Sequence, residues 1–257
     1  MVLQETTFNL EQLLRWYLEV GVDEMIGEQP LDHYTNDSTF LTPVTEVNKI
    51  VTKQTNNNSS TQLATASKTL ESLKMAIESY DGCKLKNTCR NLVFASGNPK
   101  ADLMLIGEAP GAEEDIQGIP FVGASGRLLE CILKSIRLHR KDVYITNLIP
   151  WRPPGNCKPD LITIELCLPF IIRHIELVTP RIIVFLGGTS ANALLYKHDA
   201  ISKMRGKWYN YKSTGLINSI VAMPTYHPSY LLRTPQHKRE TWHDFLSIRK
   251  KLDNLDN

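Results

Sequence analysis

The sequence predicts an α/β fold organised around a parallel β-sheet. Short apolar runs alternate with helical stretches from about residue 82 onward, and glycine or polar residues follow every run. Strands that alternate with helices are typical of parallel sheets, because each parallel strand needs a long crossover to reach the next one. The runs are Leu103–Ile106, Val143–Ile145, Ile182–Leu186 and Ile220–Met223, and the helical stretches are 125–137, 161–177, 189–196 and 240–252.

Length and composition favour one globular domain with an appendage. The chain has 257 residues, of which 42% are hydrophobic and 22% are charged. It contains no run of about 18 apolar residues, and its acidic N-terminus does not resemble a secretory signal. Five cysteines without regular spacing suit a reducing compartment better than a disulfide scaffold. We therefore expect a cytoplasmic monomer with no membrane partner.

Charge divides the chain at about residue 82. Residues 1–82 carry 5 Lys and Arg against 12 Asp and Glu, a formal charge of −7. Residues 83–257 carry 24 against 15, a formal charge of +9. A basic body on a chain of net charge +2 indicates a polyanionic partner, although ordinary surface lysines explain it equally well.

The N-terminal part is predicted to lie outside the main body. Apolar residues recur at helical spacing in residues 8–26, which indicates a short amphipathic helix. Residues 30–65 are rich in Asn, Thr and Ser and are predicted to be a flexible linker. Residues 67–80 are again helical. We therefore divide the chain into residues 1–66, a helix and linker, and residues 67–257, the globular domain.

The turn after the first run has the features of a ligand site. In parallel sheets ligands bind outside the carboxyl ends of the strands, and here the breaker-rich turn Gly107–Gly111 lets a ligand approach the backbone. The loop that follows has no Gly-Lys-Ser/Thr ending, and the acids at 113–115 would repel a phosphate. These features favour a pocket for a flat neutral ring, with Phe121 as a stacking wall; Phe121 in the core is the alternative.

Asn147 and His227 follow two other runs. The Asn147 amide offers a donor and an acceptor side by side, which matches a base edge with a carbonyl next to an N–H. His227 lies between Tyr226 and Pro228 and can donate to an oxygen on which negative charge grows. A helix-capping Asn and a structural turn histidine are the alternatives.

Two further segments suit a nucleic-acid backbone. Gly188, Thr189 and Ser190 open a helix, whose N-terminus can hold a phosphate. Residues 230–232 form an apolar tip beside Arg233, and such a tip can push into a base stack. Core packing explains the same tip equally well.

Three motifs together resemble family 4 of the uracil-DNA glycosylase superfamily. They are GEAPG-x3-D-x2-G-x-PFVG-x-x-G at 107–126, N-x3-x-RPP-x-N at 147–156 and HPSYLLR at 227–233, in the order and spacing of that family. The resemblance covers about residues 82–251. It implies a three-layer α/β/α domain with a central four-stranded parallel sheet. It also implies a partner, uracil-containing DNA, from which uracil is excised to leave an abasic site.

The resemblance also implies roles. Phe121 would stack on the flipped uracil, Asn147 would bind its O4 and N3–H, and His227 would stabilise the departing anion at O2. Leu231 would be the wedge that fills the hole left by the flipped base. Ala109 replaces the water-orienting Asp of other branches, so Glu108 is the leading water-positioning carboxylate. Glu114 and Asp115 are implied as further catalytic carboxylates, although Glu114 could instead crowd uracil C5. Gly107 and Ala109 would lie at the uracil. The residues implied at the DNA are Ser125, Gly188, Thr189, Ser229, Tyr230 and Arg233.

Two features distinguish the chain within the family. The histidine-containing insertion of a self-crosslinking branch is absent between Trp151 and Cys167, so we expect turnover. Family members usually bind a [4Fe–4S] cluster through four cysteines, and here only Cys83 and Cys167 occupy ligand positions. Tyr80 and Trp151 stand at the other two. We therefore expect no cluster and no other cofactor or metal, with Trp151 filling the vacated space.

Two alternatives to a uracil-excising enzyme remain open at this point. The missing Asp is compatible with a non-catalytic DNA- or nucleotide-binding module on the same fold. A small-molecule α/β enzyme that binds a purine or a nucleotide is the second alternative. The basic body and the tip at 230–233 favour DNA over a free nucleotide.

Overall fold

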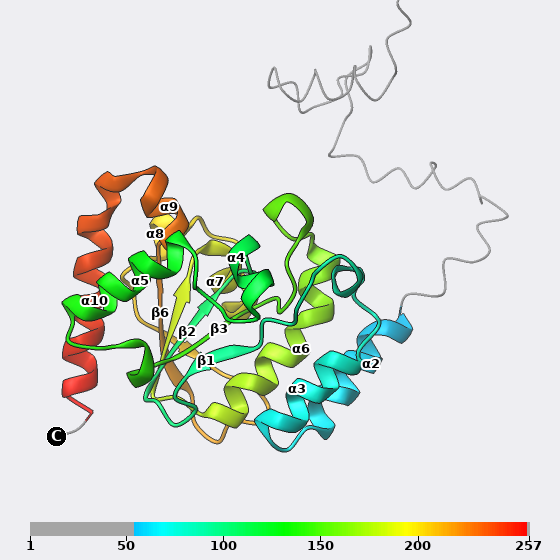
Figure 1. Ribbon diagram of the computed structural model, residues 1–257. Helices are drawn as coiled ribbons and strands as arrows, with labels where there is room; N and C mark the ends of the chain where they lie inside the picture. The colour runs from blue at the N-terminus through cyan, green and yellow to red at the C-terminus, as the bar shows by residue number, and fades with distance from the viewer. Residues whose placement is uncertain (1–53, 256–257) are drawn as a thin grey trace, which may run out of the picture. The chain divides into compact units, whose positions relative to one another are not determined.

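The computed structural model of the protein describes residues 54–255 (Figure 1). The helix expected over 8–26, and the expected linker as far as residue 53, lie outside the described residues.

A six-stranded sheet forms the centre of the domain. Its four inner strands are parallel, as expected from the alternation of runs and helices, and Leu105 of one strand lies opposite Ile145 and Val184 of its neighbours. The two edge strands are antiparallel and three residues long. The expected four-stranded parallel sheet is therefore the centre of a larger mixed sheet. The strand order is β1 (Ala95–Gly97), β3 (Tyr144–Asn147), β2 (Leu103–Gly107), β4 (Ile182–Leu186), β6 (Ile220–Thr225) and β5 (Tyr209–Tyr211).

Helices cover both faces of the sheet, which gives the three layers (Figure 1). Met104 and Ile106 of β2 point into one core, whereas Leu103 and Leu105 point into the other. Because both faces are buried, the inner strands are continuously apolar rather than alternating. One layer contains α2 (Gln54–Ala66), α3 (Leu70–Ser79), α6 (Leu161–Val178) and α7 (Gly188–Leu195), and the other contains α5 (Ala124–Ser135) and α10 (Lys238–Asp253).

Helix α2 overturns part of the expected linker. The chain is helical from Gln54, and Ser60 and Ala64 are buried where α2 packs against α6. The Arg173 guanidinium of α6 donates to the Ser67 carbonyl at 2.8 Å, which fixes the end of α2. An Asn- and Ser-rich composition predicts disorder, but here tertiary packing stabilises the helix. The body of the protein therefore begins before residue 67.

The long helices lie within three residues of their predicted bounds, whereas short ones were missed. The polar loop after β2 contains α4 (Ala112–Gln117), and HPSYLLR forms α9 (Pro228–Arg233). A third short helix is α8 (Ile201–Met204). Between residues 54 and 255, no helix combines the length and the apolar character needed to cross a membrane.

Candidate active site

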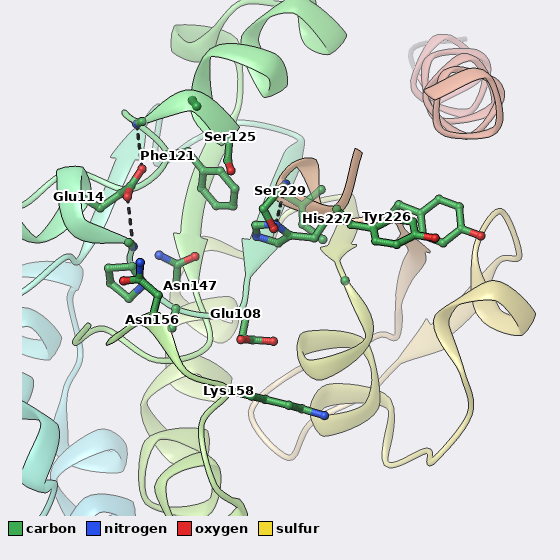
Figure 2. A pocket seen from close by; sticks show the side chains of 18 of the residues that line it. Glu108, Glu114, Phe121, Ser125, Asn147, Asn156, Lys158, Tyr226, His227 and Ser229 are labelled. Atoms are coloured by element: carbon green, nitrogen blue, oxygen red, sulfur yellow. Dashed lines mark hydrogen bonds between the residues drawn. The ribbon is translucent and has the colours of Figure 1, made fainter. Parts of the chain in front are cut away.

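A cavity of about 960 Å³ opens at the carboxyl ends of the parallel strands, where the sequence predicts the site (Figure 2). It brings together residues that follow β2, β3, β4 and β6. The predicted site residues that line it are Glu108, Ala109, Glu114, Phe121, Ser125, Asn147, Gly188, His227, Ser229, Tyr230 and Arg233.

Phe121 and Asn147 line what we call the closed end of the cavity, where each is 5% exposed and both lie against Gly107. A Cβ atom at Gly107 would lie 2.4 Å from Asn147 Oδ1 and 2.6 Å from Phe121 Cζ, so a side chain at 107 would displace both groups. Asn147 is 5% exposed, and its Oδ1 has no hydrogen-bond donor within the described part of the chain. A buried acceptor without a donor costs about 1–3 kcal/mol. The geometry therefore suits a ligand that brings an N–H to this oxygen.

The Phe121 backbone is strained and clamped from two sides. Its φ of 54° lies in the left-handed region, which is uncommon for an aromatic residue. A Cβ at Gly126 would lie 1.8 Å from the Phe121 carbonyl oxygen, so α5 can approach only because residue 126 is glycine. Arg140 donates to the Pro120 carbonyl at 2.9 Å and also to the Phe121 carbonyl. These contacts hold the ring over the cavity.

Glu114 is fully engaged in holding the loops around the cavity. Its carboxylate accepts three backbone N–H groups, from Gly111 at 3.1 Å and from Val122 and Gly123 at 2.9 Å each. Figure 2 marks two of these bonds. These bonds tie the turn after β2 to the segment that carries Phe121. Glu114 therefore has an observed structural role that the sequence did not indicate.

Asp115 does not reach the cavity. It is buried, and its Oδ1 accepts the backbone N–H groups of Arg90 at 2.7 Å and Asn91 at 3.3 Å. Its Oδ2 lies 4.0 Å from Arg152 Nη1. Because α4 turns this side chain away from the cavity, the structure does not bring Asp115 to the place expected of a catalytic carboxylate.

Of the three predicted catalytic carboxylates, Glu108 is the one that remains available. It is half-buried and lines the cavity, and Figure 2 shows its side chain directed into open space between Asn147 and Lys158. Within residues 54–255 its carboxylate accepts no hydrogen bond, whereas its backbone carbonyl accepts the Ile149 N–H at 3.0 Å. The anchored backbone and the free carboxylate suit a group that orients a water molecule.

His227 is held in one neutral tautomer. Its Nδ1 accepts the Ser229 backbone N–H at 3.1 Å and lies 2.8 Å from the Ser229 hydroxyl, which leaves the proton on Nε2. Burial and, to a smaller extent, the charge of Arg233 lower the pKa of His227 to about 4, whereas Glu114 opposes the shift. Its ring centroid lies 5.6 Å from that of Phe121. A neutral Nε2–H donor therefore lies beside the stacking wall.

Helix α9 carries four of the predicted DNA residues, and all of them except Leu231 line the cavity. Leu231, the expected wedge, is 0% exposed and belongs to the face of α9 that packs against α5. Leu232 is 42% exposed. In a helix, successive side chains point about 100° apart, so the helical form of HPSYLLR buries the first leucine and exposes the second. Leu231 could enter DNA only if α9 left α5.

A second cavity of about 870 Å³ adjoins the first and shares Glu108, Lys158 and Gly188 with it. Thr189 lines this second cavity. Sequence reasoning missed several residues that line the first cavity. The RPP-x-N motif was the signal for Asn156, whereas nothing in the sequence distinguished Lys158 or His237.

The four positions expected of cluster ligands meet in the core. Tyr80, Cys83, Trp151 and Cys167 are all buried, and the two thiols hydrogen-bond to each other, so their expected proximity is confirmed. This bond lowers the pKa of Cys83 to about 7 and raises that of Cys167. Tyr80 packs edge-on against Phe170, with ring centroids 5.2 Å apart. Two thiols, with rings instead of thiols at the other two positions, do not fit a four-thiolate cluster.

Comparison with known proteins agrees with this geometry. Residues 94–246 match the family described as the uracil DNA glycosylase superfamily. The resemblance carried by the three motifs is confirmed, and the chain belongs to this superfamily.

Three of the relatives that the chain resembles are type-4 uracil-DNA glycosylases. The protein of Saccharolobus solfataricus is 42% identical over 175 residues, which cover 66% of this chain and 80% of the relative. That of Archaeoglobus fulgidus is 39% identical over 183 residues, which cover 70% and 91% respectively. That of Thermotoga maritima is 36% identical over 168 residues, which cover 64% and 83%.

Proposed function

We propose that this chain excises uracil from DNA by hydrolysing the bond between uracil N1 and deoxyribose C1′, which leaves an abasic site. Membership of the superfamily supports this class of reaction. The observation that carries the proposal is the buried, unpaired Asn147 oxygen, enclosed with the Phe121 ring at the end of the cavity.

Uracil recognition follows from the closed end of the cavity. A uracil stacked on Phe121 would donate its N3–H to Asn147 Oδ1 and accept the amide N–H at O4. Cytosine has a bare N3 and an amine at C4, so the same amide orientation would leave two polar groups unpaired. Gly107 and Ala109 supply the backbone against which the ring lies.

Cleavage follows from His227 and Glu108. As the C1′–N1 bond breaks, its electron pair leaves with uracil, and the charge spreads onto O2. The neutral His227 Nε2–H donates a hydrogen bond to O2, and this hydrogen bond strengthens as the charge on O2 grows. Glu108 orients a water whose oxygen bonds to C1′, and the released proton passes to this carboxylate or to solvent. Glu114 and Asp115 act through the loops that they hold.

DNA would cross the mouth of the cavity. Ser125, Gly188, Ser229, Tyr230 and Arg233 line it, and Thr189 extends the surface into the second cavity. Their hydroxyls, backbone N–H groups and guanidinium suit phosphate contacts, which position a strand without specifying its sequence. The +9 charge of residues 83–257 supports the same partner. We propose that the enzyme acts as a cytoplasmic monomer.

We also propose that the chain works without an iron–sulfur cluster. Tyr80 and Trp151 occupy two ligand positions, and no group of three or more His, Cys, Asp or Glu side chains in residues 54–255 could hold a metal ion. Purified protein should contain no stoichiometric iron or acid-labile sulfide. A Tyr80→Cys, Trp151→Cys double variant is the matched control, because it restores four thiols. The proposal would be contradicted if the natural chain held stoichiometric iron and a Cys83→Ser variant did not.

Single-turnover cleavage of a uracil-containing oligonucleotide tests the function. Asn147→Asp places an acceptor opposite uracil O4, so we expect a loss of roughly 10⁴-fold on uracil, with weak release of cytosine. His227→Ala should slow cleavage by about 10² to 10³-fold and affect DNA binding less. Asn98→Asp is the control, because Asn98 lies in a turn outside both cavities and Asp retains its acceptor oxygen. If both site variants cleaved at the rate of the natural chain, the uracil pocket would lie elsewhere. If the natural chain bound DNA but did not cleave it, a non-catalytic module would be favoured.

A further inference from the structure

The cavity is larger than one base requires. Its volume of about 960 Å³ is near the upper end of the range of roughly 300–1,000 Å³ found for pockets that bind drug-sized molecules. A single pyrimidine ring at Phe121 and Asn147 fills only the closed end. Figure 2 shows Tyr226 on the far side of His227 from Phe121, and Tyr230 and His237, which also line the cavity, pack against Tyr226.

These three side chains form what we call the aromatic shelf, a cluster of mutually packed rings. The Tyr226 ring centroid lies 5.1 Å from that of Tyr230 and 5.0 Å from that of His237. Tyr230 and His237 are stacked, with centroids 5.4 Å apart and planes 25° apart. Tyr226 is 6% exposed and forms the buried base, whereas Tyr230 and His237 are half-buried and face the cavity.

The aromatic shelf is held rigidly from behind. The Arg205 guanidinium lies 5.6 Å from the centroid of the Tyr226 ring. Arg205 donates to the Glu240 carbonyl at 2.8 Å and pairs with Asp244, whose carboxylate also accepts the Thr225 hydroxyl at 2.7 Å. A platform fixed in this way loses little side-chain entropy when a ring stacks on it.

The aromatic shelf is one nucleotide away from the uracil end. His227 caps α9 and Tyr230 lies in its first turn, three residues or about 4.5 Å farther along the helix axis. Neighbouring nucleotides in one DNA strand are about 3.4 Å apart when stacked, and farther apart when extended. A mere packing cluster would account for the ring contacts, but it gives no reason for all three rings to line a cavity beside Arg233.

We propose that the aromatic shelf is a stacking site for the base adjoining uracil in the same DNA strand. The inference rests on the proposed uracil excision and adds a second base to the substrate. Because every base has a π-face, stacking tolerates any sequence. A base in the cavity cannot remain paired, so the enzyme recognises an unpaired neighbour beside the flipped uracil.

Base-free neighbours test the proposal. Single-stranded oligonucleotides with one uracil carry either a natural base or a tetrahydrofuran residue without a base on one side of it. For the natural chain, removing the base on one side of uracil should lower kcat/KM by about tenfold, whereas removing the base on the other side should change kcat/KM little. Tyr230→Leu should show the same loss on the natural strand and no further loss on the base-free strand. Tyr230→Phe keeps the ring, so it should keep the tenfold difference between the natural and the base-free strand, even if loss of the hydroxyl lowers kcat/KM equally on both strands.

Two further variants separate stacking from folding. His237→Ala changes the aromatic shelf without altering α9, and it should also abolish the response to base removal. Trp242→Ala is the matched control, because this ring is exposed on α10 and lines neither cavity. A Tyr230→Leu variant that still loses tenfold on the base-free strand would overturn the proposal. If the natural chain released uracil equally from all strands, only the stacking site would fail; if it released none, the proposed function would fail.

Discussion

Arg140 illustrates how one side chain can set the shape of a pocket that it does not line. Its guanidinium joins the Ser96 hydroxyl, the Pro120 and Phe121 carbonyls and the Glu130 carboxylate. Phe121 keeps a positive φ, and such backbone strain costs about 1–3 kcal/mol unless the surroundings compensate for it. Arg140 is therefore a positioning residue for the stacking ring.

Arg140→Met tests this role, because methionine fills the space without donating. Hydrogen bonds from a charged donor contribute about 1.5–3 kcal/mol, so we expect cleavage to slow by about 10 to 100-fold. Inhibition by free uracil should weaken by a similar factor, whereas affinity for abasic-site DNA should not change, because that DNA carries no ring to stack. Arg249→Met is the control, since Arg249 pairs with Asp253 on the surface of α10. Equal losses of uracil and abasic-DNA affinity would indicate general damage instead.

At the scale of single residues, the sequence predicted which residue types lie at the site better than it predicted where their side chains point. Asn147, Phe121 and His227 meet in one cavity as expected, because each follows a strand of the same parallel sheet. Asp115 does not reach that cavity, and Leu231, the expected wedge, is buried. Each lies in a short helix that the sequence did not reveal and whose rotation decides where the side chain points. A motif fixes which residue types are near a site, and the local backbone decides which of them face it.

At the scale of helices and strands, the length of an element decided whether the sequence could predict it. The four apolar runs and the long helices have periodicity that extends over several residues, so their positions follow from the sequence. The edge strands β1 and β5 have three residues each, too few for a pattern. Helix α2 has a polar composition, and the face that stabilises it is supplied by α6, which no local pattern can show.

Helix α2 leads to a prediction about truncation. The motifs alone suggest that residues 67–257 suffice, but that chain would uncover α6 and remove the Ser60 hydroxyl that bonds to Tyr80. We expect a loss of about 2–4 kcal/mol, which for a domain of this size lowers Tm by roughly 5–15 °C. A chain of residues 50–257 is the matched control and should keep the stability of its folded body. Thermal unfolding followed by circular dichroism decides the matter, and equal Tm values for both chains would show that α2 contributes nothing.

At the scale of the whole molecule, a buried histidine, His174, and a half-buried one, His227, link folding to pH. His174 is buried, and burial lowers its pKa to about 3; its Nε2 lies 2.8 Å from the Tyr144 hydroxyl, and its ring stacks on Phe94. The pKa of His227 is lowered to about 4, also by burial. Each histidine is therefore neutral in the folded protein at pH 5, whereas an unfolded chain takes up a proton near pH 6.5.

The sign of this linkage predicts acid lability. Between about pH 6.5 and pH 4 the unfolded state binds more protons than the folded state, so stability falls as pH falls. Each histidine should add about 1.4 kcal/mol per pH unit to the slope once its unfolded form is protonated. Burial raises the pKa of Asp244, which acts in the opposite direction and only near its own titration range. Urea unfolding at pH values spaced through this window measures the slope.

His174→Gln separates the histidine contribution from that of the carboxylates. Glutamine keeps a polar group near the Tyr144 hydroxyl but does not titrate. The plot of unfolding free energy against pH should therefore be less steep by the contribution of one proton, even if the stability of the variant at pH 7 is lower. His139→Gln is the control, because His139 lies on the surface and its backbone, not its ring, is the group that bonds Asp142. A slope unchanged in His174→Gln would mean that carboxylates alone set the acid limit of this fold.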